Sequence, residues 1–171
     1  MNPEQGKFLC KVLCDTIEME FETTKKVIRA VPDDKKSYKP ETKSMSAHEL
    51  AWHIASAEIF FLDAVINGKF DTSGEHAAAP PTIAAILEWY ESNHKSRMAT
   101  LQNVAADKIV TPVGFFGVME LPAVAYLNLM NLHTSHHRGQ LSTYLRPMGS
   151  RVPSIYGGSA DEPFQAAGAN A

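Results

Sequence analysis

The sequence has little cysteine. Among its 171 residues, only Cys10 and Cys14 carry thiols. A spacing of four residues puts both thiols on one face of a predicted helix, where an unstrained disulfide between them is disfavoured. Two thiolates are also too few for a structural metal site built from cysteines. The sequence therefore predicts two buried free thiols.

Long apolar runs and a dominant charge are absent as well. No apolar run approaches the ~20 residues that span a bilayer, and the N-terminus lacks the basic and apolar regions of a secretory signal. The formal net charge of −3 offers no basic surface for nucleic acid. Seven of the sixteen basic residues lie between Lys25 and Lys43, but Asp33, Asp34 and Glu41 are interleaved with them, as in a solvated helix end and loop. We expect a cytoplasmic protein that binds neither nucleic acid nor a membrane.

Several common catalytic signatures are also missing. The stretch from His133 to His137, HTSHH, lacks the glutamate of the H-E-x-x-H metalloprotease motif. A di-iron bundle requires two E-x-x-H motifs, and this chain has one, from Glu91 to His94. The sequence contains neither a glycine-rich phosphate loop nor a serine nucleophile elbow. These absences disfavour a zinc protease, a di-iron protein, a nucleotide-binding enzyme and a serine hydrolase.

The sequence does contain four segments with helical periodicity. Cap signals mark two starts: Asn2 precedes a proline, and Ser46 and Glu49 form a capping box. A third helix is expected to start near Thr82, where an apolar stripe begins. Gly68 marks a helix end, and Pro122 is the expected start of the last helix. Similar helix lengths in a chain of this size predict an all-α fold, a four-helix bundle. The predicted helices cover residues 3–30, 46–67, 82–104 and 122–146.

The connections between these helices are long. Each has about 14 residues and can reach over ~40 Å, enough to run the length of a helix, so a crossover topology is permitted but not determined. Residues 108–121 are unusually apolar for a loop. They predict a plug or short strand pair over one end of the bundle, or equally a surface for dimerisation. We expect residues 1–150 to form the bundle and residues 151–171 to form an extended C-terminal tail.

The last helix carries three closely spaced histidines. Positions four apart on a helix differ by about 40° in direction, so the side chains of His133 and His137 converge on one point. His136 diverges from His137 by about 100° and is expected to be more exposed. His133 and His137 also follow the apolar face of this helix. They are therefore predicted to act as a pair of metal ligands.

Two imidazoles rarely hold a metal alone, so a third ligand is expected from another helix. The remaining histidines are His48 near a helix start, His53 one turn further on, His76 in a loop and His94 on an apolar stripe. Spacing alone leaves His53 and His94 as equal candidates. A site with three histidines keeps at least one position open for water or substrate, which is typical of catalytic metal sites.

Two stretches resemble a known family. The stretches NLHTSHHRGQLSTYLRPMG, at residues 131–149, and SAHELAWHIASAEIFFLDAV, at residues 46–65, are similar to the DinB-like (YfiT-like) metalloenzyme family. The resemblance implies a four-helix bundle with long connections. The resemblance implies a divalent metal, nickel, zinc or iron, bound by His53, His133 and His137. It also implies a homodimer and, as in some relatives, a thiol-dependent transferase that uses a low-molecular-weight thiol.

A metal site of this kind predicts an enzyme that acts on a small-molecule substrate. Tyr90, His94 and Tyr144 are candidate proton donors to the metal cavity, and Arg138 is a candidate for its rim, where it would hold an anionic substrate or thiol. A metal-dependent hydrolase is an alternative. A second alternative is a non-catalytic, stress-response helical binding module whose histidines are polar residues of the core.

Overall fold

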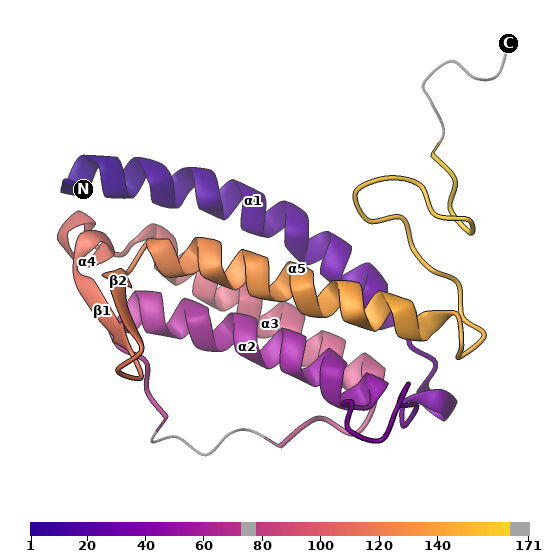
Figure 1. Cartoon of the computed structure of the whole chain (residues 1–171). Helices are drawn as coiled ribbons and strands as arrows, with labels where there is room; N and C mark the ends of the chain where they lie inside the picture. The colour runs from indigo at the N-terminus through magenta and orange to yellow at the C-terminus, as the bar shows by residue number, and fades with distance from the viewer. Residues whose placement is uncertain (73–77, 165–171) are drawn as a thin grey trace, which may run out of the picture.

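The computed structural model describes residues 1–72 and 78–164. Four long helices lie side by side in a bundle, and a small two-stranded sheet sits at one end (Figure 1). The predicted all-α four-helix bundle is confirmed. The long helices are α1 (Pro3–Arg29), α2 (Ala47–Asn67), α3 (Ile83–Gln102) and α5 (Ala125–Leu145), and the shorter elements are the 3-10 turn η1 (Asp33–Lys35), α4 (Ala106–Val110), β1 (Pro112–Phe115) and β2 (Met119–Pro122).

Side-chain caps begin three of the long helices where the sequence predicts them. The Asn2 side chain accepts a hydrogen bond from the Gln5 backbone N–H at 2.9 Å, which satisfies a free donor of the first turn of α1. Ser46 and Glu49 form the reciprocal capping box of α2. The Thr82 side chain caps α3. At the other end of α2, Gly68 adopts a left-handed φ of 73°, the conformation expected of a C-terminal glycine cap.

The bundle has one crossover connection. α2 and α3 both begin at the same end of the bundle and run in the same direction, while α1 and α5 run the opposite way (Figure 1). His48, at the start of α2, has its Nε2 2.7 Å from the carbonyl oxygen of Pro80, which lies just before α3. This contact agrees with both helices beginning at the same end of the bundle. The connection after Gly68 therefore spans the length of the bundle. α3 and α5 each pack against α1 and α2, so they lie diagonally opposite each other.

The apolar segment before the last helix forms a β-hairpin. β1 and β2 pair antiparallel with Val113 opposite Leu121, and the turn contains Phe116 at φ 47°. The Tyr126 hydroxyl donates to the Val113 carbonyl at 2.7 Å and ties the hairpin to α5. The expectation that the last helix begins at Pro122 is wrong, because this proline ends β2 and α5 begins only at Ala125. A proline suits a strand end as well as a first helical turn, so it did not distinguish the two.

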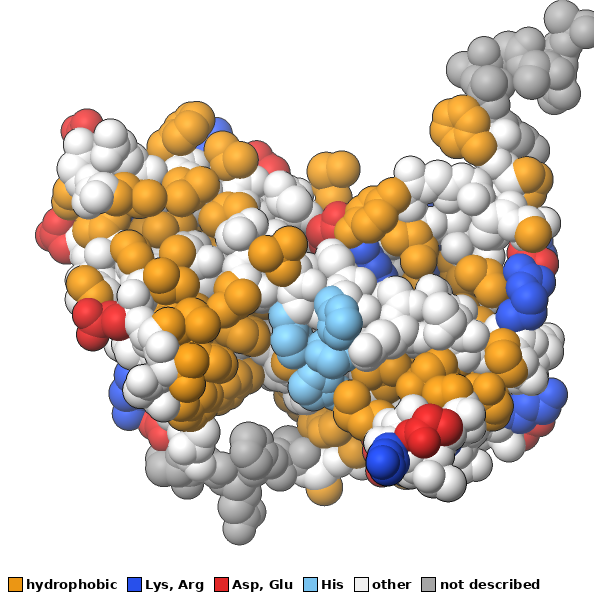
Figure 2. Space-filling view, viewed as in Figure 1, with side chains coloured by type: hydrophobic (Ala, Val, Ile, Leu, Met, Phe, Trp, Pro, Cys, Tyr) orange, Lys and Arg blue, Asp and Glu red, His pale blue; other side chains and the backbone are white. Residues whose placement is uncertain are grey.

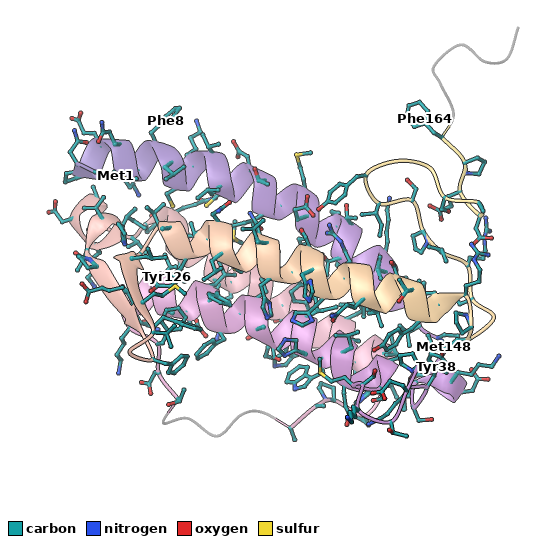
Figure 3. The ribbon with its side chains drawn as sticks, in the orientation of Figure 1. Met1, Phe8, Tyr38, Tyr126, Met148 and Phe164 are labelled. Carbon is teal, nitrogen blue, oxygen red and sulfur yellow. The ribbon has the colours of Figure 1, made fainter. Side chains whose placement is uncertain are left out.

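The two cysteines lie one turn apart on α1. Cys10 and Cys14 are buried free thiols, as predicted, with their sulfur atoms 4.0 Å apart. Residues 151–164, the described part of the tail, contain neither a helix nor a strand. Figure 3 places Tyr38 and Met148 at the same end of the bundle, where α5 ends. Within the described residues, no helix is both long and apolar enough to cross a membrane.

Candidate metal centre

Three histidine side chains meet between α2 and α5. One nitrogen each of His53, His133 and His137 lies within 4.8 Å of the others. The Nε2 atoms of His53 and His133 are 3.2 Å apart, and the ring centre of His137 lies 4.5 Å from that of His53 and 4.4 Å from that of His133. All three residues are half-buried. Figure 2 shows the histidines as one pale-blue cluster that reaches the surface in the middle of the molecule.

Helical geometry explains why two of these side chains come from α5. His133 and His137 lie one turn apart and face α2, which runs antiparallel to α5 and presents His53 at the same level. His136 is exposed, as its position in the turn predicts. The diagonal placement of α3 keeps His94 away from this pair. The topology thus distinguishes His53 from His94, which helical spacing alone left as alternatives.

The distances fit a single metal ion. Two histidine nitrogens bound to one zinc ion at about 2.0–2.1 Å, near a tetrahedral angle, are separated by roughly 3.3 Å. The observed separation of 3.2 Å between His53 Nε2 and His133 Nε2 agrees with this value. Burial, reinforced by the neighbouring imidazoles, lowers the pKa of His133 to about 4, and burial and His137 lower the pKa of His53. Both rings are therefore neutral at pH 7, the form that binds metals.

Gln140 fixes the orientation of His137. Its side-chain oxygen lies 2.8 Å from His137 Nδ1, and because this oxygen is an acceptor, Nδ1 carries the proton. The lone pair of His137 is then on Nε2, which is free to bind a metal. The Gln140 side-chain amide donates in turn to His136 Nε2 at 3.0 Å. Hydrogen bonds of this kind behind a ligating imidazole are typical of metal sites.

The surroundings of His133 argue against a purely structural role. Its Nδ1 is buried and has no hydrogen-bond partner among the described residues. Its Nε2 lies 3.2 Å from the Nε2 of His53. When a polar side chain has a purely structural role in the core, each of its buried polar atoms normally forms a hydrogen bond. The facing Nε2 atoms of the two rings are compatible with a metal ion held between them.

Tyr90 and His94 lie in a separate polar cluster around Glu58. The Tyr90 hydroxyl donates to Glu58 Oε2 at 2.6 Å, and His94 Nδ1 donates to Glu58 Oε1 at 2.8 Å. Burial, together with the Glu58 carboxylate, raises the pKa of Tyr90, so its hydroxyl stays protonated. The ring of His94 stacks on Phe21 of α1 at 3.7 Å between ring centres, and its Nε2 faces Glu18 at 3.4 Å. The expectation that both residues face the metal cavity is not met, because their polar atoms are directed to this cluster.

Arg138 does not lie at the rim of the site either. Its side chain is 1% exposed and pairs with Glu20 of α1 at 2.6 Å. It also donates to the Thr24 hydroxyl at 3.1 Å and to the hydroxyl of Tyr156 from the tail. The rotation of about 100° from His137 to the next residue turns Arg138 towards α1 instead of solvent. Its charge is thus already neutralised inside the bundle.

Tyr144 lies on the same side of α5 as His137, two turns further along the helix. Together with His137, it lines a surface cavity of about 510 Å³. The opposite wall comes from the segment between α1 and α2, which contributes Lys43, Ser44 and Met45. Tyr144, one of the four residues proposed as proton donors or as the anion-holding group, therefore shares a cavity with a predicted ligand.

Sequence reasoning missed Gln140 and the segment around Lys43. Gln140 could have been found, because positions three and four residues after His137 and His136 face those histidines on a helix. No local pattern connects Lys43 to residues about 95 positions later, since only the folded topology brings them together. Of the two remaining candidate histidines, His48 donates to the Pro80 carbonyl, and His76 lies outside the described residues.

Comparisons with known proteins agree with the fold. The model of the DinB family matches residues 7–166. The protein YrdA of Bacillus subtilis (strain 168), described as uncharacterized, is 24% identical over 146 residues, which cover 85% of this chain and 86% of YrdA. The crystal structure of the DinB-like protein YjoA from Bacillus subtilis has a TM-score of 0.69 at 23% identity and covers 84% of this chain and 96% of its own. A DinB-like protein from Bacillus cereus ATCC 10987 has a TM-score of 0.72 at 25% identity, over 84% of this chain and 95% of its own. With a family model that spans nearly its whole length, this chain belongs to the DinB family.

Proposed function

We propose that this protein is a metal-dependent enzyme whose divalent ion is held by His53, His133 and His137. The observation that carries the proposal is the convergence of three histidine nitrogens within 4.8 Å, with no cysteine, aspartate or glutamate joining the group among the described residues. Three protein ligands leave a position open, which distinguishes a catalytic site from a closed structural one. Three imidazole ligands suit nickel, zinc and iron alike.

The proposed reaction class is thiol-dependent transfer to a small substrate, and metal-dependent hydrolysis is the alternative. A bound divalent metal would lower the pKa of a thiol or water at the open position and so supply a nucleophile near neutral pH. The protein's own residues orient the reactants. Gln140 holds His137 in the tautomer that leaves Nε2 free, and the Tyr144 hydroxyl can donate a proton to a leaving group in the adjoining cavity.

The experiment that tests this proposal compares histidine variants by metal content. We expect the purified wild-type protein, or the protein reconstituted with zinc or nickel, to contain about one metal ion per chain. His133→Ala should lose that ion, because His53 and His137 alone hold it weakly. His136→Ala is the matched control, since His136 lies on the same turn but is exposed. Absence of bound metal in the wild-type protein after reconstitution would contradict the proposal and favour the non-catalytic binding module.

We also propose that the protein forms a homodimer through the outer face of α1. Phe8, Val12 and Met19 are 72%, 45% and 74% exposed and follow one stripe of this helix. Figure 3 shows Phe8 directed away from the bundle. Large exposed apolar groups on one face are typical of an interaction surface. Light scattering should report twice the chain mass for the wild type and the chain mass for Phe8→Glu combined with Met19→Glu, whereas a monomeric wild type would refute the proposal.

A further inference from the structure

Cys10 and Cys14 form a pair of thiols that the proposed function does not use. They lie one helical turn apart on α1, and their Sγ atoms are 4.0 Å apart. Both are free, and they are 4% and 9% exposed. Because side chains four positions apart on a helix point in nearly the same direction, the two sulfur atoms lie side by side, in a geometry that disfavours a disulfide. The pair therefore remains available as two sulfur ligands.

The two thiols line a cavity of about 530 Å³ between α1 and the end of α3. Lys7 and Lys11 line the same cavity, and Asp15 supplies its one carboxylate among the described residues. The Lys7 ammonium group is held in place, because it donates to the backbone carbonyls of Gln102 and Val104 at 3.2 and 3.0 Å. Positive charge fixed beside a thiol stabilises the thiolate, which is the form that binds metals.

The hydrogen bond between the two thiols also favours a thiolate. Donated by Cys14, it lowers the pKa of Cys10 to about 7, with the help of Lys7 and against the effect of burial. The same hydrogen bond raises the pKa of Cys14, so the proton that the pair retains stays on Cys14. One proton therefore has to leave the pair when a metal binds both sulfur atoms.

The available donors select a soft ion that accepts two ligands. Among the described residues, no histidine or carboxylate, including that of Asp15, forms a group of three ligands with these cysteines within 4.8 Å. Zinc sites need four ligands, so zinc is disfavoured, whereas thiolates without harder donors select Cu(I). Two thiolates at ~2.3 Å from one ion are separated by roughly 3.8 Å at a tetrahedral angle and 4.6 Å on a line. The observed separation of 4.0 Å lies in this range.

We propose that Cys10 and Cys14 bind one Cu(I) ion between their sulfur atoms. The site is separate from the candidate metal centre, because it lies between α1 and α3, whereas the three histidines meet between α2 and α5. Two thiolates and one monovalent copper ion carry a net negative charge, which the lysines of the cavity wall offset. Binding changes no oxidation state: copper–sulfur bonds form, and the proton held by Cys14 passes to solvent. The low exposure of both residues shields the bound ion from water.

The test is a titration of the reduced, metal-free protein with Cu(I), without oxygen and in competition with bicinchoninate, a chelator that is coloured when it binds Cu(I). We expect one tightly bound ion per chain, with the same affinity in the wild type and in His53→Ala combined with His133→Ala. Cys14→Ser should weaken binding by about 100-fold or more, because a second thiolate on the same helix acts at a high effective concentration.

X-ray absorption at the copper edge identifies the ligands in the wild-type protein, without any substitution. With one Cu(I) per chain, we expect two sulfur ligands and no imidazole. Zinc content of Cys14→Ser should equal that of the wild type, since neither cysteine belongs to the histidine group. No binding of Cu(I), copper bound through imidazole, or an unchanged affinity in Cys14→Ser would overturn the inference. Absence of zinc from the reconstituted wild type would instead overturn the proposed function alone.

Discussion

Replacement of Arg138 by methionine should destabilise the protein strongly. The Arg138 side chain is 1% exposed and that of Glu20 is 17% exposed, and their charged atoms are 2.6 Å apart. Methionine retains much of the volume of the arginine stem but removes the charge and every donor. The carboxylate of Glu20 then remains mostly buried, with the Tyr156 hydroxyl as its remaining side-chain partner.

The magnitude follows from the burial of the two charges. Removal of one member of a fully buried ion pair costs about 3–5 kcal/mol, mainly because the other charge is left uncompensated. Glu20 retains some exposure, so we expect a loss of about 2–4 kcal/mol in the free energy of unfolding. The matched control is Arg97→Met, because Arg97 and Asp63 form a comparable pair with side chains 31% and 40% exposed. That substitution should cost about 0–1 kcal/mol.

The assay is urea denaturation of the metal-free wild type and variants, with the slope of the transition checked for constancy. Arg138→Met combined with Glu20→Gln should recover part of the loss, because the second change removes the uncompensated charge. A cost for Arg138→Met no larger than that for Arg97→Met would refute the reasoning. It would indicate that Arg138 is available to solvent and could serve at the rim of the site after all.

Two further substitutions test other parts of the structure. Gln140→Leu should weaken metal binding by about 10- to 100-fold without unfolding the protein, because it removes the hydrogen bond that orients His137. Competition with a chelator measures the metal affinity, and an unchanged affinity would contradict the role of Gln140. Gly6→Ala should destabilise the protein by about 1–3 kcal/mol, since its Cβ would lie 2.3 Å from a valine methyl of α4. In Gly139→Ala the added Cβ would have no atom within 4 Å, so this substitution should be neutral or stabilising by about 0.5–1 kcal/mol. Equal changes in the free energy of unfolding at the two glycines, measured by urea denaturation, would contradict the observed packing of α1 on α4.

Local signals in the sequence predicted the helices well. A capping side chain acts on backbone groups two or three residues away, so Asn2 and Ser46 identify helix starts without knowledge of the rest of the fold. The i, i+4 relation of His133 and His137 is local in the same way. Pro122 failed as a signal, because its fixed φ suits both a helix start and a strand end, and only the pairing of β1 with β2 distinguishes them.

Properties that depend on helix arrangement could not be predicted from spacing. His53 and His94 both lie on inward faces, but α2 packs against α5 whereas α3 lies diagonally across from it. The choice of His53 from the sequence therefore depended on family resemblance. Arg138 follows His137 directly, and its burial depends on α1 covering that side of α5. The Lys43 side of the cavity comes from a segment about 95 residues earlier, which no periodicity relates to α5.

X-ray absorption spectroscopy of the zinc-loaded protein tests the central claim most directly. We expect three imidazole nitrogens at about 2.0–2.1 Å and at least one further oxygen ligand from solvent. Addition of a thiol should replace that oxygen by one sulfur at about 2.3 Å and leave the three imidazoles in place. A spectrum with fewer than three imidazoles, or with four ligands that a thiol does not change, would contradict an open site held by His53, His133 and His137.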